Sequence, residues 1–394
     1  MTLQDRIDAA LSAAVQAGQV PGVAAMVTDP HHTRYQGAFG VRTLGQPQAM
    51  DLDTVGWIAS MTKAITAAAA MQLVERGLLE LDAPAFRWLP ELASVPVLEG
   101  FDAQGRPITR APRRPITLRH LLTHTAGFGY DTWNPEVRRY QEALGLPLMA
   151  SGRRAALMTP LLFDPGQRWN YGIGIDWAGR LVEQASGQRL GEYLARHVFE
   201  PLGMTRTGFA LTTAMRERLA RIHQRDADGS LRPLHDFEII QQPEFEGGGG
   251  GLYSTAADYL RFLRMILNDG LSDDGARVLR PETVDLMSRN HIGGQRVSPM
   301  RSLNPARSND AEFFPGVPKS WGLSFQINEA PAPTGRPAGG LMWAGLSNCY
   351  YWIDRGNRLA GVYLTQVLPF ADRLSLPLYL AMETEVYRAL SAGG

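Results

Sequence analysis

The chain has 394 residues, of which 44% are hydrophobic and 20% charged, a composition typical of a globular protein with a substantial core. Basic and acidic residues number 39 each and are interspersed, so the charge predicts neither nucleic-acid binding nor attachment to an anionic membrane surface. No apolar run approaches the length of a membrane span, and the single cysteine, Cys349, cannot form an internal disulfide. Small neutral partners fit this balance better.

The N-terminal segment predicts a helix and then a pair of strands. Residues 1–18 carry apolar side chains at helical spacing and lack the basic flank and apolar stretch of a signal peptide, so a cytoplasmic protein is expected. Residues 20–29 and 33–41 follow as two strands. They are joined by a polar turn, to which we assign His31 and His32 in preference to a metal site.

Residues 57–77 form the most informative stretch of the chain. It is rich in alanine, has no glycine or proline between Ser60 and Arg76, and ends at Gly77, which predicts one helix beginning at Ser60. Ser60 and Lys63 are three residues apart, so a hydroxyl and an amine lie on one helix face within reach of each other. This is a nucleophile beside a possible base.

Lysine usage strengthens this interpretation. Lysine occurs only at Lys63 and Lys319, so 37 of the 39 basic residues are arginine. A guanidinium stays protonated, whereas an amine in an apolar setting can lose its proton and act as a base. The pattern favours a chemical role for Lys63 over the alternative, a helix cap followed by a solvated lysine.

The next segment is rich in prolines. Residues 81–118 predict a loop-rich cap, followed by a short helix that begins at Thr117 and stops at Gly127. His120 and His124 are four residues apart, but no acidic residue lies between them as a His-Glu-x-x-His zinc site requires. We therefore expect His124 to be a partly protonated imidazole near a helix C-terminus.

A second informative patch lies at residues 161–191. The turn that begins at Asp164 presents Trp169 and Tyr171 on a short connection before a helix at residues 175–186. Glycines on both sides give Tyr171 room for close approach to a ligand, although a tyrosine packing on its own helix is the alternative.

Five glycines at residues 247–251 predict a tight backbone crossing near a pocket, with Gly250 among the residues that line it. The Gly-Lys-Ser/Thr ending of a nucleotide loop is absent. Thr255 caps a helix to about residue 267, and residues 290–318 form a long surface loop. The remaining elements predicted are strands at residues 321–327, 341–343, 348–354 and 359–365 and a helix at residues 376–392.

Strands at both ends with helices and loops between them predict an α+β fold, in which an antiparallel sheet built from both termini is flanked by helices. The first unit comprises residues 1–80 and 320–394, and residues 81–319 form an inserted helical and loop unit. The active site is expected at their junction, where ligand sites usually lie.

Several motifs together carry a resemblance. In chain order they are Ser60-Met-Thr-Lys63 and the segments at residues 118–127, 163–171, 201–204 and 248–254. Over about residues 5–390 the chain resembles the serine β-lactamase and penicillin-binding-protein superfamily. Within it, the chain looks most like the family VIII carboxylesterases, which share the class C β-lactamase fold.

The resemblance implies a mechanism. Ser60 would be the nucleophile, and Lys63 and Tyr171 would form a polar pair that shares the proton transfers, with the choice of base left open. The backbone N–H groups of Ser60 and Leu346 would hold the oxyanion. This chemistry needs no metal or organic cofactor.

Two departures from the superfamily pattern bear on the substrate. The Tyr-x-Asn element is Tyr171-Gly172-Ile173 here, and tryptophan stands where relatives place a cation that grips a substrate carboxylate. A neutral ester with a short acyl chain is therefore the expected substrate. The residues expected to bind it are Trp343, Ala344, Gly345, Trp169 and Gly250.

Other functions compete with the esterase. An acyltransferase on the same fold would pass the acyl group to an alcohol or amine, and a weak β-lactamase or D-peptidase-like hydrolase is a further alternative. An α/β-hydrolase is excluded because no Gly-x-Ser-x-Gly occurs. Intact Ser60, Lys63 and Tyr171 argue against a binding module without catalysis.

Overall fold

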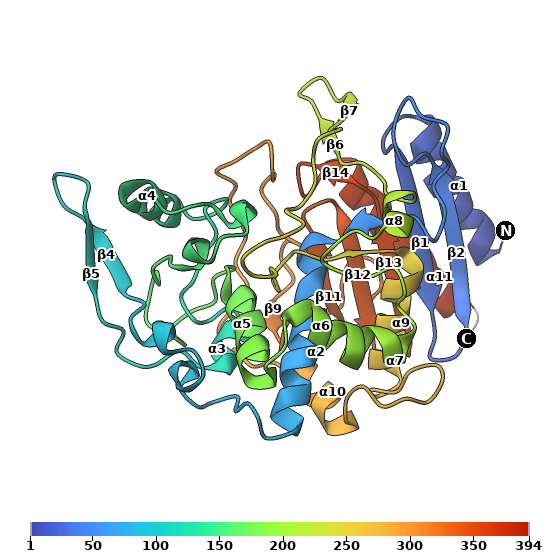
Figure 1. Cartoon of the computed structure of the whole chain (residues 1–394). Helices are drawn as coiled ribbons and strands as arrows, with labels where there is room; N and C mark the ends of the chain where they lie inside the picture. The colour runs from blue at the N-terminus through green and yellow to red at the C-terminus, as the bar shows by residue number, and fades with distance from the viewer. Residues whose placement is uncertain (1, 393–394) are drawn as a thin grey trace.

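The computed structural model describes residues 2–392, so residue 1 and residues 393–394 of the predicted first unit lie outside it. Its centre is a seven-stranded antiparallel sheet in the order β2-β1-β13-β12-β11-β10-β9, built from both ends of the chain (Figure 1). This confirms the predicted fold. The strands are β1 (Gly22–Thr28), β2 (Thr33–Gly40), β9 (Lys319–Trp321), β10 (Gln326–Asn328), β11 (Leu341–Gly345), β12 (Cys349–Asp354) and β13 (Leu359–Leu364).

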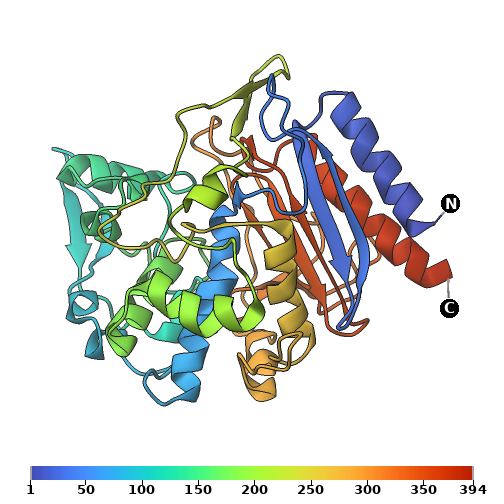
Figure 2. The same cartoon turned by 45° about the vertical axis from the view of Figure 1, so that its right-hand side comes forward.

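Helices cover both faces of the sheet. Figure 2 shows α1 (Leu3–Gln16) and α11 (Ser375–Ala392) side by side on one face. On the other face α9 (Ala256–Leu267) packs against β1 and β13. Because both faces are covered, every residue of β1, β12 and β13 is buried, and these strands lack the alternation of a one-sided sheet.

The middle of the chain forms the second part of the molecule, at the left of Figure 1. The central helix α2 (Thr62–Glu75) packs against α5 (Gly174–Ser186) from this part. The other helices are α3 (Leu118–Leu122), α4 (Pro135–Leu144), α6 (Leu190–Leu194), α7 (Glu200–Leu202), α8 (Thr213–Arg216) and α10 (Pro281–Met287). The small strands are β3 (Gly56–Trp57), β4 (Val97–Phe101), β5 (Pro107–Arg110), β6 (His223–Arg225), β7 (Leu231–Pro233), β8 (Tyr253–Ser254) and β14 (Val367–Leu368).

Three predictions about the fold need correction. The proline-rich segment contains a hairpin, β4 and β5, which its turn signals did not reveal. The strand predicted at residues 321–327 is two short strands, because the chain turns at Ser324, whose φ is +79°. The predicted boundary at residue 319 does not follow the packing, since α9 lies within the supposed insert yet covers the sheet.

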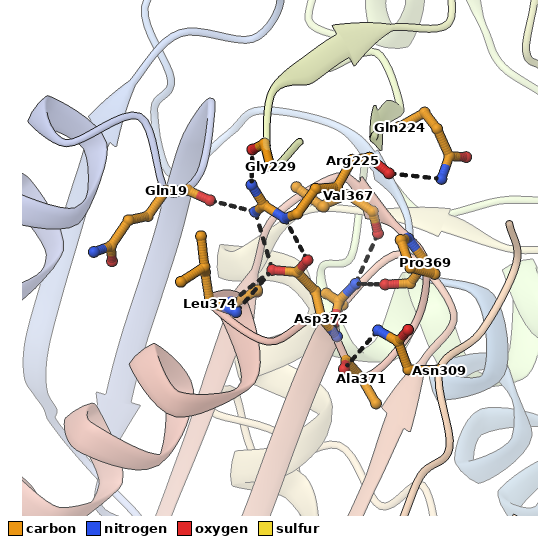
Figure 3. A network of polar contacts seen from close by, with 12 residues as sticks. Gln19, Gln224, Arg225, Gly229, Asn309, Val367, Pro369, Ala371, Asp372 and Leu374 are labelled. Carbon is orange, nitrogen blue, oxygen red and sulfur yellow. Dashed lines mark hydrogen bonds and ion pairs between the residues drawn. The ribbon is translucent and has the colours of Figure 1, made fainter. Parts of the chain in front are cut away.

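A buried ion pair joins three distant segments, as Figure 3 shows. Arg225 donates from Nε and Nη2 to the two carboxylate oxygens of Asp372, at 2.5 and 3.0 Å. Its Nη2 also donates to the carbonyl of Gln19, and its Nη1 donates to the carbonyl of Gly229. Asp372 in turn accepts the backbone N–H of Ser375 at the start of α11. We call this group the Arg225 clasp, because it ties β6 to both ends of the chain.

Within residues 2–392, none of the helices has both the length and the apolar character needed to cross a membrane.

Candidate active site

Ser60 lies at the entry to α2, in a 3-10 turn at Ala59–Met61. The helix proper begins at Thr62, close to the predicted start, and its alanines are buried almost completely. Ala59, directly before Ser60, has a φ of +44°, a conformation that costs a non-glycine residue about 1–3 kcal/mol. Such strain is concentrated at functional sites, where the surrounding structure holds it.

Lys63 is fully buried and points back toward Ser60. Its Nζ lies 3.1 Å from Ser60 Oγ, 3.1 Å from Tyr130 Oη and 2.5 Å from the carbonyl oxygen of Gly249. The structure thus brings together the serine and the lysine that the sequence paired. An ammonium has three donors, and three acceptors surround this one.

Tyr130 and Asp176 complete the group, and the sequence reasoning missed both. Asp176, in the first turn of α5, accepts the N–H of Gly249 at 2.9 Å and the hydroxyl of Tyr130 at 3.4 Å. Burial raises the pKa of Asp176, and Lys63 opposes that rise. Burial and the Asp176 carboxylate raise the pKa of Tyr130 well above its usual value, so its phenol stays protonated. An acidic residue in a first helical turn is common, so no local signal marks Asp176.

Tyr171 does not form the polar pair with Lys63 that was predicted. Its hydroxyl accepts a hydrogen bond from Trp343 Nε1 at 3.2 Å, and its ring centroid lies 4.8 Å from Lys63 Nζ. No hydrogen bond joins Tyr171 to Ser60 or Lys63 in the described part of the chain. The ring face favours a nearby cation, but in this structure the hydroxyl beside the amine belongs to Tyr130.

Trp343 was predicted to form a wall of the substrate cleft, and this prediction is wrong. Its side chain is 2% exposed and packs edge-on against Trp321, with ring centroids 4.7 Å apart. Trp169 is also buried and stacks on Tyr171. Aromatic rings bury a large apolar area, and here they do so against one another behind the cleft. Of the predicted substrate-binding residues, Gly250 lines the cleft, and Trp343, Ala344, Gly345 and Trp169 do not.

Gly345 instead shapes the backbone beside the nucleophile. A Cβ at this position would lie 2.2 Å from the carbonyl oxygen of Ile58, so only glycine lets β11 approach so closely. The next residue, Leu346, lines the same cleft as Ser60. No protein acceptor is present among residues 2–392 for the backbone N–H of Ser60 or Leu346. The predicted oxyanion donors are therefore free to serve a ligand.

The glycine run crosses α2 tightly at the edge of a pocket, as predicted. The carbonyl of Gly248 accepts Thr66 Oγ1 at 2.8 Å, and that of Gly249 accepts Lys63. A Cβ on Gly249 would lie 2.3 Å from Asp176 Oδ2. A side chain there would therefore displace the Asp176 carboxylate.

The cleft that contains Ser60 encloses about 1020 Å³, counting its open mouth. Its walls are mostly apolar, and Arg307 is the one arginine among the described residues that line it. The guanidinium of Arg307 forms no hydrogen bond or ion pair within residues 2–392. The larger apolar residues that line it are Trp57, Trp133, Met149, Phe209, Ile239, Ile240, Pro243, Phe245 and Leu346.

His120 and His124, the two histidines at the short helix, both lie within hydrogen-bond distance of backbone N–H groups. Burial and the charge of Lys63 hold the pKa of His124 well below its usual value. The prediction that this imidazole is partly protonated is therefore wrong. Its Nδ1 accepts the N–H of Gly172 at 3.4 Å. Nδ1 of His120 lies 3.3 Å from the backbone N of Thr117 at the helix start. Residues 2–392 contain no group of three or more His, Cys, Asp or Glu side chains arranged to hold a metal.

The family follows from a match to the β-lactamase family model over residues 7–383, and the chain belongs to this family. Among curated proteins, the chain is 35% identical over 402 residues to lovastatin esterase of Penicillium rubens, covering 98% of this chain and 99% of that one. It is 32% identical over 406 residues to monacolin J acid methylbutanoyltransferase of Aspergillus terreus, covering 98% and 96%.

Solved structures give the same picture. A mutant form of simvastatin synthase from Aspergillus terreus superposes with a TM-score of 0.86 at 33% identity, covering 98% of this chain and 97% of that chain. EstCE1, described as a hydrolase with promiscuous acyltransferase activity, superposes with a TM-score of 0.77 at 25% identity, covering 98% of both chains. Relatives that align over nearly the whole chain thus include both esterases and acyltransferases.

Proposed function

We propose that the protein hydrolyses carboxylic esters through an acyl-enzyme on Ser60. Family membership and the aligned relatives make it a serine hydrolase or acyltransferase. Ester hydrolysis as the main reaction, and the roles of the individual residues, are proposed here. One observation carries it: the buried amine of Lys63 lies 3.1 Å from Ser60 Oγ, at the edge of an apolar cleft. A serine beside a desolvated amine is an activated nucleophile.

In the first half of the reaction, Lys63 Nζ takes the proton of the Ser60 hydroxyl while Oγ forms a bond to the ester carbonyl carbon. The carbonyl oxygen becomes an oxyanion and accepts the N–H groups of Ser60 and Leu346. The bond to the alcohol oxygen then breaks, and the alcohol leaves with a proton. In the second half, water attacks the acyl carbon and gives a proton to the group that had protonated the alcohol. The bond from the acyl carbon to Ser60 Oγ breaks as Lys63 returns its proton to Oγ, which releases the acid.

The proton roles are divided among three groups. Lys63 is the base, because its amine lies within hydrogen-bond distance of Ser60 Oγ and the Tyr171 hydroxyl contacts Trp343 instead. Burial and the Asp176 carboxylate raise the pKa of Tyr130, which keeps that phenol protonated. Tyr171 accepts from Trp343, and its own hydroxyl hydrogen has no acceptor within residues 2–392. We assign to Tyr171 the donation of a proton to the leaving alcohol, which retains its predicted share in the transfers.

The acyl group of the substrate is proposed to be short and uncharged. The apolar lining of the cleft supports an uncharged substrate, whereas Trp343 gives no such support, because its side chain is buried. Asp131, Asp176 and Arg307 are the charged residues among the described ones that line the cleft, and of these the guanidinium of Arg307 is the group that would attract an anion. Comparing kcat/KM for 4-nitrophenyl butyrate and nitrocefin tests the proposal, and we expect the ester to be preferred by orders of magnitude. Efficient nitrocefin hydrolysis that Arg307→Gln abolishes would establish an anion site instead.

The acyltransferase is the second candidate, because relatives of both kinds align with the chain. The ratio of hydrolysis to transfer, measured with 4-nitrophenyl butyrate and increasing concentrations of an added alcohol, separates the two. We expect free butyrate to remain the main product. A butyrate ester of the added alcohol as the main product would favour the transferase.

A fluorophosphonate is the direct test of the nucleophile. We expect it to label the protein stoichiometrically at Ser60 and to leave Ser60→Ala unlabelled. A wild-type protein that is neither labelled nor active on esters would contradict the proposed function.

A further inference from the structure

The carboxylate of Asp176 contacts both of the groups that, with Ser60, hold Lys63. It is 3% exposed, its Oδ1 accepts the N–H of Gly249 at 2.9 Å, and its Oδ2 accepts the hydroxyl of Tyr130 at 3.4 Å. The carbonyl of Gly249 and the hydroxyl oxygen of Tyr130 are the other two partners of the Lys63 amine. Asp176 is therefore placed to control the direction of these hydrogen bonds.

The direction follows from the donor inventory of each group. An ionised carboxylate only accepts, and a tyrosine hydroxyl has a single hydrogen, so Tyr130 donates to Asp176 and can only accept from Lys63. The carbonyl of Gly249 also only accepts. A neutral Lys63 amine has two N–H donors and one lone pair. When both donors serve Tyr130 and Gly249, the lone pair is directed at the third partner, Ser60 Oγ.

We propose that Asp176 is a positioning residue that keeps the Tyr130 hydroxyl turned away from Lys63, so that the amine lone pair faces Ser60. This rests on the proposed function, because it needs Lys63 to act as the base. The other groups around Lys63 do not compete for the lone pair. His124 is neutral and hydrogen-bonded to Gly172, and Tyr171 presents its ring face rather than its hydroxyl.

Asp176→Asn tests the direction of the network. The amide oxygen can keep the N–H of Gly249, which leaves the amide N–H₂ against Tyr130, and the tyrosine hydrogen then turns to the Lys63 lone pair. We expect kcat for 4-nitrophenyl butyrate to fall about 100-fold, in the range of a lost general base, with little change in KM. The rate of Ser60 labelling by the fluorophosphonate should fall by a similar factor.

Combining Tyr130→Phe with Asp176→Asn tests whether the Tyr130 hydroxyl is the group that blocks the Lys63 lone pair. Alone, Tyr130→Phe removes one partner of Lys63 and should lower kcat by about 10-fold, less than a lost general base costs. In the double variant Asp176→Asn/Tyr130→Phe no hydroxyl is left to block the lone pair, so activity should rise above that of Asp176→Asn to the level of Tyr130→Phe. A merely structural Asp176 would give losses that multiply, and that result would overturn the proposal.

Asp258 provides a matched control, since it is also a buried aspartate in the first turn of a helix. Its carboxylate accepts hydrogen bonds from the backbone N–H of Arg206 and the hydroxyl of Thr207. Asp258→Asn should leave kcat within about twofold of wild type, because it contacts none of the Lys63 partners. If Asp176→Asn does not melt cooperatively, Asp176→Ala replaces it, since it also frees the Tyr130 hydroxyl and the same rescue is expected. An active wild type with a normal Asp176→Asn would overturn only this inference and leave the proposed function standing.

Discussion

Two buried networks in this molecule each contain one cation and one carboxylate, but they connect the two charges differently. In the Arg225 clasp the guanidinium binds Asp372 directly through two hydrogen bonds. In the active site Lys63 and Asp176 are separated by the hydroxyl of Tyr130 and by the peptide of Gly249. A direct pair holds its protons and stabilises the fold. A separated pair leaves the amine able to exchange a proton with Ser60.

The residue types match this division. Arginine stays protonated and binds a carboxylate through a planar fork, which suits a clasp that ties chain ends together. Lysine can lose its proton when it is desolvated. The other lysine of the chain, Lys319, donates to the Glu312 carboxylate at 3.2 Å and to the carbonyl of Phe314, so it resembles the clasp rather than Lys63. Burial of a lysine alone therefore does not make a base.

The largest effect is expected for Ser60→Ala, which removes the nucleophile and one contact of Lys63. Ester turnover should fall by about 10⁴-fold or more, as for other serine nucleophiles. The fold should persist, because Ser60 caps nothing that the clasp or the sheet depends on. Steady-state kinetics and a thermal melt check this. Unchanged ester hydrolysis in Ser60→Ala would contradict the proposed acyl-enzyme mechanism.

Lys63→Arg makes the active-site cation resemble that of the clasp. The charge is kept but the titratable amine is lost, so we expect kcat to fall about 10³-fold, nearly as far as in Lys63→Ala. Lys319→Arg is the matched control and should keep normal turnover in its folded fraction, because Lys319 does not line the cleft. Substantial activity in Lys63→Arg would mean that Lys63 acts only through its charge and that another group is the base.

Asp372→Asn breaks the clasp and should act on stability instead of chemistry. Removing the charge opposite a buried arginine costs about 3 kcal/mol of unfolding free energy, measured by urea denaturation. The half-exposed Asp51, which pairs with Arg42, is the control, and Asp51→Asn should cost less than about 1 kcal/mol. Turnover per folded molecule should be unchanged in both. A kcat loss in Asp372→Asn would contradict the division between the two networks.

Tyr171→Phe should have the smallest effect and one that depends on the leaving group. If Tyr171 protonates the departing alcohol, kcat/KM for ethyl butyrate should fall about 10-fold more than for 4-nitrophenyl butyrate, whose phenol leaves without help. Tyr130→Phe is the comparison and should affect both esters equally, because it acts on the base. An equal loss on both esters in Tyr171→Phe would place Tyr171 with the base instead.

The sequence by itself determined what depends on local spacing. The Ser60/Lys63 pair follows from helical geometry, because residues three apart share a face. The helix starts at Thr117 and Thr255 follow from capping chemistry, and in the structure each threonine accepts the N–H of the residue three positions later. The antiparallel sheet follows from strands and turn signals at both ends of the chain.

Tertiary structure decided which side chains surround Lys63 and which way the aromatic residues face. Tyr130 and Asp176 come from separate segments, 67 residues beyond Lys63 and a further 46 residues along, and no periodicity predicts that they meet. Trp343 was misplaced because β11 is buried on both faces, so alternation along the strand does not indicate which face lines the cleft. Local patterns therefore positioned the nucleophile, whereas long-range packing chose the partners that direct its base.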